Sequence, residues 1–439
     1  MKLLKIKDNS RIPNTEFSRI EKLAEKIANK NLEQLEREGL FVFPETIKDS
    51  ENIESDQMIL QSINDTYKSG NLMGFLGYGD ERLVIESRFC GDGEDFFFIH
   101  LLNRVLDVPN TVDLETHFSQ ENRVLDILMF LFPYYLNRAA RKGLFKKYIV
   151  RVYNDQNVKG NIDIVRHIKE NTPFVGNVAY SRREFSCDNS LMQLVRHAIE
   201  FIKRKPFGKN ILMRVKEEVE LVVASTPCFS LRERQKVVLD NEGSPVRHAY
   251  FREYYSLQKL CLLILRNQRH QIGFGLKRIY GVVIDGAWLW EEYVNLLVKD
   301  IFYHPKNRGG VGAQRLFERN AGLIYPDFIS TDRERRIIAD AKYKPVNNIG
   351  NRDYLQILAY MFRFDAKCGY FLYPEIEGSA DVILRMNYGS TYESNVAPRD
   401  DVCVVKRGLK IPVNARDYKE FVSRLADQEK LFKCAFLRN

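Results

Sequence analysis

Two carboxylates and a lysine are spaced so that they could act together on a phosphodiester. Asp327 follows a proline in the stretch YPDFIS, and Asp340 and Lys342 come thirteen and fifteen positions later in IADAKYK. Both stretches are apolar and strand-like, and the polar TDRER between them has the composition of a turn. We therefore expect a β-hairpin that brings the two stretches side by side.

The chemistry depends on the register of this hairpin. If the turn is centred on Arg333 and Glu334, antiparallel pairing places Asp327 opposite Asp340, with Cβ atoms ~5 Å apart. Two anions at that distance need a shared proton or a cation. Lys342 shares a face with Asp340, because alternate residues of a strand point the same way, and such a face suits Mg²⁺ with a lysine beside the attacking water. A one-residue slip removes the arrangement, and taken alone the pattern fits an ordinary solvated hairpin equally well.

A third carboxylate is expected to reach the same place from a helix. In the segment WLWEEYVNLLVKDIF, a rotation of ~100° per residue puts Glu291 on the apolar side with Val294 and Val298, whereas Glu292 falls on the polar side with Lys299. A buried carboxylate is strongly unfavourable unless it has a partner. The partner of the Glu291 carboxylate could be a metal ion at the site or the positive charge of a nearby Arg or Lys.

Gln356 and Tyr360 are second-tier candidates. They lie one turn apart on one face of the helix predicted for RDYLQILAYMFRF, which follows the hairpin. Asp353 lies three residues before Gln356 and fits a capping box that would start this helix. Helix capping is therefore a sufficient structural reason for Asp353 and Gln356.

The charge of the chain fits a polyanionic partner. Lys and Arg number 67 against 58 Asp and Glu, which gives a net charge of +9 and a pI near 9.0. Such an excess is compatible with nucleic-acid binding. Arg333, Arg335 and Arg336 around the predicted turn are candidates for contacts with DNA phosphates, although charged turns are usually just solvated.

Several classes of protein are disfavoured. The seven cysteines occur singly, so neither a disulfide framework nor a zinc ribbon is expected, and a reducing, cytoplasmic setting follows. The N-terminus turns polar too soon for a secretory signal. The longest apolar run, 127–136, is short of the ~20 residues that span a membrane and should be a buried helix, kinked or ended near Pro133. There is no G-x-x-x-x-G-K-[ST] phosphate loop, and the glycines at 307–312 are expected to form a turn.

The elements around these residues can be outlined from periodicity and turn residues. An amphipathic helix is predicted at 14–38 and short strands between 71 and 108. Helical periodicity dominates 119–225, with one hairpin whose turn lies near 154–156. The stretch NEGSPVRH at 241–248 combines Asn, Gly, Ser and Pro and is the predicted main boundary.

These elements predict an α+β protein in three segments. A mixed α/β region of unassigned role covers 1–115, a mainly helical region covers 116–245, and an α/β domain covers 246–439. The last segment holds, in order, a helix, a strand, the helix with Glu291, the hairpin, the helix with Gln356 and a further strand.

This order of elements resembles the PD-(D/E)xK, or restriction-endonuclease-like, nuclease superfamily, and the Q-x-x-x-Y spacing is of the kind seen in its RecB-like branch. A wider likeness is to the McrC family, the nuclease subunit of McrBC-type restriction systems. It runs in order from Lys142 to Tyr370 and includes five positions outside the nuclease motif: Gly143, Tyr148, Gly160, Asp188 and Asn189. The first ~110 residues match no motif, which leaves room for a subfamily such as the LlaJI-like systems.

The resemblance implies a Mg²⁺-dependent DNA endonuclease of a modification-dependent restriction system. Asp327 and Asp340 would bind the metal with help from Glu291, and Lys342 would orient the water and stabilise the developing charge. Segment 116–245 would bind a separate McrB-like AAA+ GTPase, which would bind the GTP. Two alternatives stay open: a non-catalytic adaptor that activates the GTPase, and a nuclease of DNA repair that works without a motor.

Overall fold

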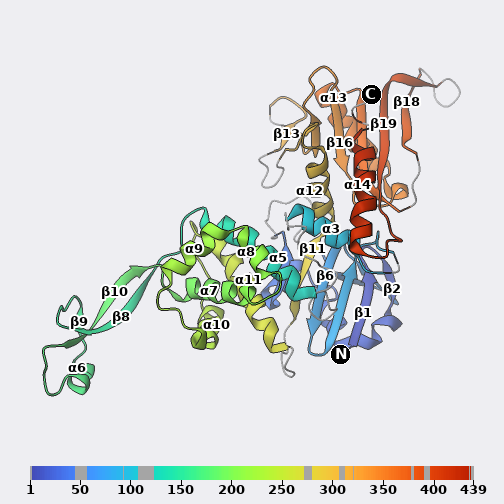
Figure 1. The fold of residues 1–439 in the computed structure, drawn as a ribbon. Helices are drawn as coiled ribbons and strands as arrows, with labels where there is room; N and C mark the ends of the chain where they lie inside the picture. The colour runs from blue at the N-terminus through green and yellow to red at the C-terminus, as the bar shows by residue number, and fades with distance from the viewer. Residues whose placement is uncertain are drawn as a thin grey trace. The chain divides into compact units, whose positions relative to one another are not determined.

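The structure is a computed structural model that describes residues 2–44, 57–91, 93–106, 123–270, 279–305, 312–319, 321–376, 380–389, 396–434 and 436. The predicted glycine turn at 307–312 lies almost wholly outside these residues. The chain forms two compact units (Figure 1). Unit 1 combines residues 1–119 with residues 275–439, and unit 2 comprises residues 120–274.

This division differs from the three predicted segments. The break at 119 lies close to the predicted boundary at 115, but the predicted boundary at 245 falls inside unit 2. The reason is that the last helix of unit 2 packs against the helices that precede the Asn/Gly/Ser/Pro stretch. The N-terminal region and the predicted nuclease domain belong to one unit.

The first chain segment of unit 1 is rich in short strands. Its elements are β1 (Lys2–Lys7), β2 (Arg11–Pro13), η1 (Asn14–Ile20), α1 (Glu21–Ile27), α2 (Leu32–Glu38), β3 (Leu40–Phe43), β4 (Leu60–Ile63), β5 (Thr66–Ser69), β6 (Leu72–Tyr78), β7 (Glu81–Glu86) and α3 (Phe96–Val105).

Two predictions for this region need correction. The helix predicted at 14–38 is broken into η1, α1 and α2, because Asn29 adopts a left-handed conformation and Asn31 caps α2. The strands predicted between 71 and 108 are confirmed as β6 and β7, but the phenylalanine-rich end of that stretch is the helix α3. Asp95 starts this helix by accepting a hydrogen bond from the N–H of Phe98.

The second segment of unit 1 builds the predicted nuclease part. Its elements are β11 (Tyr280–Asp285), α12 (Gly286–Val298), β12 (Phe302–Tyr303), β13 (Gln314–Arg315), β14 (Leu323–Ile324), β15 (Phe328–Ser330), β16 (Ile337–Ala341), η4 (Val346–Asn348), α13 (Asn351–Phe364), β17 (Cys368–Glu375), β18 (Val382–Tyr388), β19 (Ala397–Lys410) and α14 (Tyr418–Cys434).

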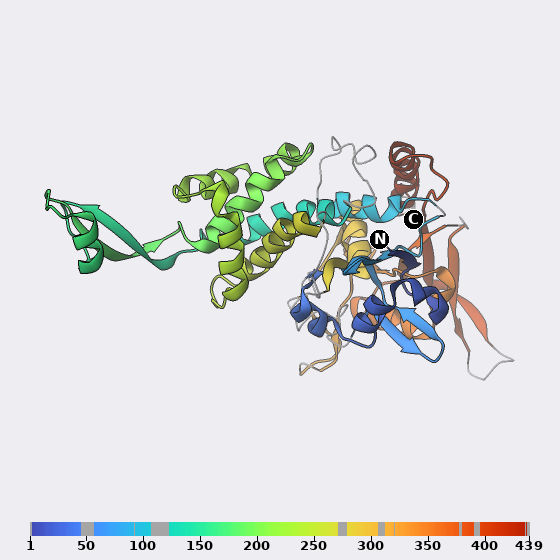
Figure 2. The ribbon, with the colours of Figure 1, turned by 90° about the horizontal axis from the view of Figure 1, so that it is seen from below.

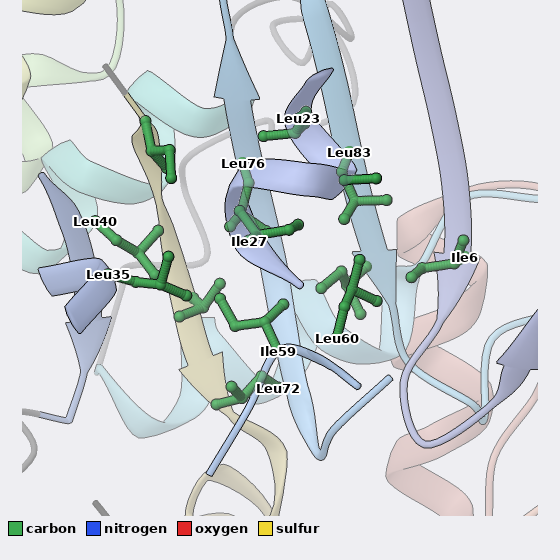
Figure 3. Packing of buried hydrophobic residues seen from close by; sticks show 14 of the residues in the cluster. Ile6, Leu23, Ile27, Leu35, Leu40, Ile59, Leu60, Leu72, Leu76 and Leu83 are labelled. Carbon is green, nitrogen blue, oxygen red and sulfur yellow. The ribbon is translucent and has the colours of Figure 1, made fainter. Parts of the chain in front are cut away.

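The two segments share a five-stranded sheet with the order β1-β7-β6-β11-β3. The strand β11 comes from the second segment and pairs antiparallel with β6 and parallel with β3. Leucine and isoleucine side chains of β6, β7, α1 and α2 fill one core on this sheet (Figure 3). Because β11 lies inside this sheet, the N-terminal region and the start of α12 are parts of one hydrophobic structure.

A six-stranded sheet carries the hairpin, in the order β12-β15-β16-β17-β19-β18. The strands β16, β17 and β19 are parallel, and the pairs at either end are antiparallel. α13 packs on this sheet through Ile357, Tyr360 and Met361, which share a core with Ile338 and Phe371. The sheet and α13 thus position the two predicted site motifs.

Unit 2 is a helical bundle with a projecting arm. Its elements are α5 (Arg123–Ala140), β8 (Lys147–Asp155), β9 (Asn161–Ile162), α6 (Ile164–Glu170), β10 (Val178–Ser186), α7 (Ser190–Lys203), α8 (Gly208–Met213), α9 (Lys216–Ser225), η2 (Leu231–Glu233), α10 (Arg234–Gly243) and α11 (Glu253–His270). The predicted buried helix is α5, which continues through Pro133. Among the described residues, no helix is long and apolar enough to cross a membrane.

The arm consists of β8, β9, α6 and β10, and we use this name for it below. β8 and β10 pair antiparallel from Lys147 with Ser186 to Asp155 with Val178. Figures 1 and 2 both show this ribbon leading away from the helices of unit 2, with β9 and α6 at its far end. The sequence pattern predicted a hairpin with its turn near 154–156, in which β8 would pair with the residues directly after the turn. This pairing was wrong, because β8 pairs with β10, whereas the residues after the turn form β9 and α6.

Candidate active site

The hairpin is present, and its register is the predicted one. β15 and β16 pair antiparallel with Phe328 opposite Ala339. One further step along this register places Asp327 opposite Asp340. The assumption on which the sequence argument depended is therefore confirmed.

The turn of the hairpin is held by its own side chains. Asp332 accepts hydrogen bonds from two backbone N–H groups of the turn, at 2.8 and 3.2 Å, as in an Asx-turn. Arg333 and Arg335 are exposed, whereas Arg336 is half-buried and donates a hydrogen bond to the carbonyl of Ser330 at 3.2 Å. A part in DNA binding stays a prediction for all three arginines, and Arg336 also has this structural role.

The two aspartates of the site have different surroundings. Asp340 is 2% exposed, and Asp327 is half-buried and accepts a hydrogen bond at Oδ2 from the N–H of Ala341 at 2.8 Å. Burial, followed by the nearby carboxylates of Glu291 and Asp340, raises the pKa of Asp327 well above its usual range. The site therefore gathers acidic groups in a poorly solvated place, where their mutual repulsion disfavours the charged form of Asp327.

Lys342 supplies the compensating charge. Its Nζ lies 2.5 Å from Oδ2 of Asp340 and 3.7 Å from Oδ1 of Asp353. Burial opposes its charged form, but Asp340 and Asp327 together outweigh burial, and the pKa of Lys342 is raised. Lys342 is therefore an ammonium group at neutral pH, suited to hold a water or stabilise an anion and unsuited to accept a proton.

The second-tier residues contact this lysine. Gln356 accepts a hydrogen bond from Lys342 Nζ at 3.3 Å and donates one to the hydroxyl of Tyr360 at 2.6 Å. The predicted capping box between Asp353 and Gln356 was wrong, because α13 begins earlier, and Asp353 instead accepts from the N–H of Gly350. Gln356 is thereby available to Lys342.

Asp353 has a further role that the sequence did not reveal. Its carboxylate accepts hydrogen bonds from Nζ of Lys344 at 2.8 and 2.6 Å, and it also lies near Lys342. Although burial opposes it, these hydrogen bonds and charges lower the pKa of Asp353. The carboxylate is thus a fixed anion that holds both lysines of the motif, a contact formed only when α13 packs on β16.

Glu291 approaches from α12, as the helical phase predicted. Its side chain is 14% exposed, and Oε1 lies 3.7 Å from Nε2 of His304. Nδ1 of His304 is 2.8 Å from the backbone oxygen of Asp327, and its ring stacks on Phe328. No sequence pattern indicated His304, which joins Glu291 to the residue that precedes the first strand of the hairpin. Glu292 is also half-buried, although it was predicted to be solvated.

The residues present fit a magnesium site made by two carboxylates. Oδ2 of Asp340 is buried, and no donor among the described residues forms a hydrogen bond of ordinary geometry with it. The ammonium group of Lys342 lies close to this oxygen. Mg²⁺ is commonly bound by one or two carboxylates, with waters and substrate phosphate oxygens as its other ligands. Within the described residues, no three His, Cys, Asp or Glu side chains are grouped closely enough to hold a metal. Asp327 and Asp340 therefore suit a direct role, and Glu291 suits a supporting one.

Asp188 and Asn189, two of the five positions singled out in unit 2, lie where the arm joins the helices. Asp188 is buried and accepts hydrogen bonds from Arg151 at 3.0 Å and from the N–H of Cys228 at 3.1 Å. Asn189 caps α7 and donates to the carbonyl of Phe145 at 3.0 Å. These contacts fix the base of the arm, which is a structural reason for both residues.

The remaining three of these positions have local roles in unit 2. Gly143 adopts a φ of +88°, which favours glycine. A Cβ at Gly160 would lie 2.1 Å from the carbonyl oxygen of Ser181. Tyr148 is exposed and packs on Phe185, with ring centroids 5.0 Å apart. None of the three bears on the candidate active site.

The chain is similar to a known protein family and to solved structures. Residues 67–374 match the family described as McrBC 5-methylcytosine restriction system component. Among solved structures, the chain is similar to a chain of the half-complex from a tetradecameric assembly of Thermococcus gammatolerans McrB AAA+ hexamers with bound McrC, with 14% identity, a TM-score of 0.48 and coverage of 97% of this chain and 99% of that one. The cryo-EM structure of the Thermococcus gammatolerans McrBC complex gives 14% identity, a TM-score of 0.31 and coverage of 68% and 88%. No curated protein matches the sequence significantly.

Proposed function

This chain belongs to the family of McrBC 5-methylcytosine restriction system components, and we propose that it is the component that cleaves DNA. One observation carries the proposal: the hairpin register that sets Asp327 opposite Asp340, with Lys342 beside Asp340. Two carboxylates and an ammonium group in a poorly solvated place are suited to metal-assisted hydrolysis of a phosphodiester.

Each residue would have a distinct part in that reaction. Asp327 and Asp340 would hold Mg²⁺, which when bound neutralises phosphate charge and makes a bound water more acidic. Lys342 would orient the attacking water and stabilise the charge that develops on the phosphate oxygens. Gln356 and Asp353, which contact Lys342, would keep the lysine in place. Glu291, held by His304, would add negative charge beside Asp327.

A partner protein would supply the nucleotide-driven step. The sequence has no phosphate-binding loop of its own, and the family is named as a component of a system. We propose an AAA+ GTPase of the same system as the partner and the arm as the element that binds it. The arm exposes Val150, Val152, Val165 and Phe174, and isolated proteins rarely leave so many apolar side chains in water without a binding role.

The decisive experiment replaces one carboxylate. Asp340→Asn keeps the size of the side chain and removes its charge, so it should lower Mg²⁺-dependent cleavage of methylated DNA, measured with the partner GTPase and GTP, by at least ~100-fold. Partner binding should be unchanged. Asp365→Asn is the matched control, because Asp365 is exposed at the end of α13 in a left-handed conformation that asparagine also adopts. Cleavage by Asp340→Asn at the parental rate would exclude the assignment.

A second function is favoured by a separate observation. Within the described residues, no group of three candidate ligands is assembled for a metal, whereas the apolar arm is well formed. A chain that only binds and activates the GTPase would have these features. If the chain only activates the GTPase, the Asp340→Asn variant should still stimulate GTP hydrolysis and should still support restriction in cells. If the chain is the nuclease, the same variant should stimulate GTP hydrolysis but should no longer support restriction.

A further inference from the structure

Tyr343 connects the motif strand to the N-terminal region. It follows Lys342 directly, is 6% exposed, and its hydroxyl lies 2.7 Å from Oγ of Ser87. The same hydroxyl lies 3.3 Å from the sulfur of Met73. The side chain that follows the candidate catalytic lysine is therefore bound by residues about 250 positions earlier in the chain.

The N-terminal region forms a cradle for this tyrosine, which we define as Asp8, Ser87 and Arg88. Asp8 follows β1, and Ser87 and Arg88 follow β7, which is parallel to β1, so the three residues emerge at the same edge of the sheet. Arg88 forms a buried ion pair with Asp8 at 2.6 Å and places its guanidinium group 4.9 Å from the centre of the Tyr343 ring. Asp95 accepts a hydrogen bond from the N–H of Ser87 at 2.5 Å.

The other side of the tyrosine ring meets the start of α12. A Cβ built on Gly286 would lie 2.7 Å from Cε1 of Tyr343, so the ring and the helix start are in close contact. Along α12, Trp290 lies next to Phe97 of α3, with ring centroids 6.1 Å apart, and donates a hydrogen bond to the carbonyl of Leu372 in β17. Tyr343 therefore lies between the end of the motif strand and the helix that carries Glu291.

We propose that Tyr343, held by the cradle, is a positioning residue that fixes Lys342 relative to Glu291. The inference rests on the proposed nuclease function. The N–H of Lys342 donates to the carbonyl of Leu372 at 2.8 Å, and the chain turns at Tyr343, because the N–H of Lys344 donates to the carbonyl of Lys342 at 2.9 Å. By binding the side chain of Tyr343, the cradle can therefore hold this turn and with it the backbone of Lys342. The N-terminal region then belongs to the scaffold of the active site. A shift of ~1 Å in the position of a catalytic group can lower the rate of the reaction by up to ~100-fold. A scaffold that fixes Lys342 is therefore important for catalysis.

The test is a double-mutant cycle on the shared hydrogen bond. Tyr343→Phe and Ser87→Ala each remove one hydroxyl, and each should lower the single-turnover rate of cleavage, measured with the partner GTPase, by ~5–10-fold. The double variant should be no slower than the slower single variant, because both changes remove the same contact. The DNA concentration that gives half-maximal rate should stay the same. Ser87→Thr keeps the hydroxyl and should restore the rate.

A matched variant separates positioning from loss of stability. Ser69 is also a buried serine of the N-terminal region, and its hydroxyl donates to the carbonyl of Lys7 at 2.8 Å. Ser69→Ala should lower the melting temperature about as much as Ser87→Ala and leave the cleavage rate unchanged. The inference is overturned if Tyr343→Phe cuts at the parental rate, or if the two losses are independent and multiply. The Asp340→Asn variant separates this inference from the proposed function. If Asp340→Asn cuts DNA at the parental rate, the proposed nuclease function is wrong. If Asp340→Asn is inactive but Tyr343→Phe cuts at the parental rate, only the positioning role of Tyr343 is wrong.

Discussion

The pairing of Asp327 with Asp340 is unfavourable for the protein without metal. The carboxylate of Asp327 is enclosed, faces two other acids and has a raised pKa. The folded chain therefore keeps a proton on Asp327 at pH values where the unfolded chain, with a pKa of ~3.9, has lost it. Ionisation of Asp327 opposes folding, and this loss of stability grows as pH rises from ~4 towards the folded pKa. A bound cation would reverse it.

Asp327→Asn should therefore stabilise the metal-free protein at high pH. The melting temperature of the variant should exceed that of the parent by a few degrees at pH 8, and the difference should shrink as pH falls and vanish below about pH 3, where Asp327 is protonated in both the folded and the unfolded parent. Added Mg²⁺ should raise the melting temperature of the parent and leave that of the variant unchanged.

Calorimetry across this pH range provides the measurement, and Asp365→Asn again provides the control. Asp365 is exposed, so its replacement should shift neither the pH dependence nor the response to Mg²⁺. Melting temperatures of parent and Asp327→Asn that run parallel from pH 4 to pH 8 would contradict the raised pKa.

At the scale of the elements, the arm exposes apolar side chains on β8 and α6. No residue of α6 is buried, and on β8 the alternate residues Val150 and Val152 are 69% and 63% exposed. These side chains lie on one face of the ribbon, because alternate residues of a strand point the same way. The contacts of Asp188 and Asn189 hold only its base. An apolar ribbon anchored at one end is suited to bind a partner along its length.

The paired substitution Val150→Ser and Val152→Ser should weaken association with the partner GTPase by at least ~10-fold. The melting temperature of the chain should hardly change, because exposed side chains contribute little to folding. Binding is measured by titration of the labelled chain with the GTPase and nucleotide.

Leu431→Ser offers a matched control for the arm variant. Leu431 lies on α14 in unit 1 and is 66% exposed. Its replacement by serine therefore removes exposed apolar surface outside the arm. If both variants weaken association equally, the arm is not the specific contact. If the variant with Val150→Ser and Val152→Ser binds the GTPase as tightly as the parent, the proposed role of the arm in partner binding is wrong.

In the molecule as a whole, unit 1 is built from two distant segments of the chain. The strand β11 has a partner on each side, β6 and β3, and both come from the first segment. Asp285 at its end caps α12 by accepting hydrogen bonds from the N–H groups of Ala287 and Trp288. The N-terminal region therefore supports the element from which Glu291 projects.

A fragment of residues 275–439 should not fold by itself. Without residues 1–119, both edges of β11 lose their hydrogen bonds, and the buried side chains of Val282, Val283 and Ile284 face water. Mixing the two fragments should restore a single cooperative unfolding transition, measured by circular dichroism. The fragment of residues 120–274 should fold alone as a control, and cooperative unfolding of 275–439 alone would disprove the dependence.

The features that depend on local periodicity could be predicted from the amino-acid order. Alternation and turn residues indicated the hairpin, whereas its register was an assumption that the pairing of β15 with β16 then confirmed. Helical phase predicted that Glu291 faces inward from α12, where it lies beside His304, although Glu292 is half-buried as well. The family resemblance followed from the same residues, since the motif and its order are linear properties of the chain.

Contacts between distant residues could not be predicted in this way, because they form only in the folded chain. His304, Asp353 and the Ser87 contact of Tyr343 depend on packing between elements that no local pattern connects, and the place of β11 in the N-terminal sheet depends on pairing across more than 200 residues. The hairpin predicted near 154–156 failed for the same reason, because β10 pairs better with β8 than the nearer residues do. Local patterns specify elements, whereas long-range packing selects their partners.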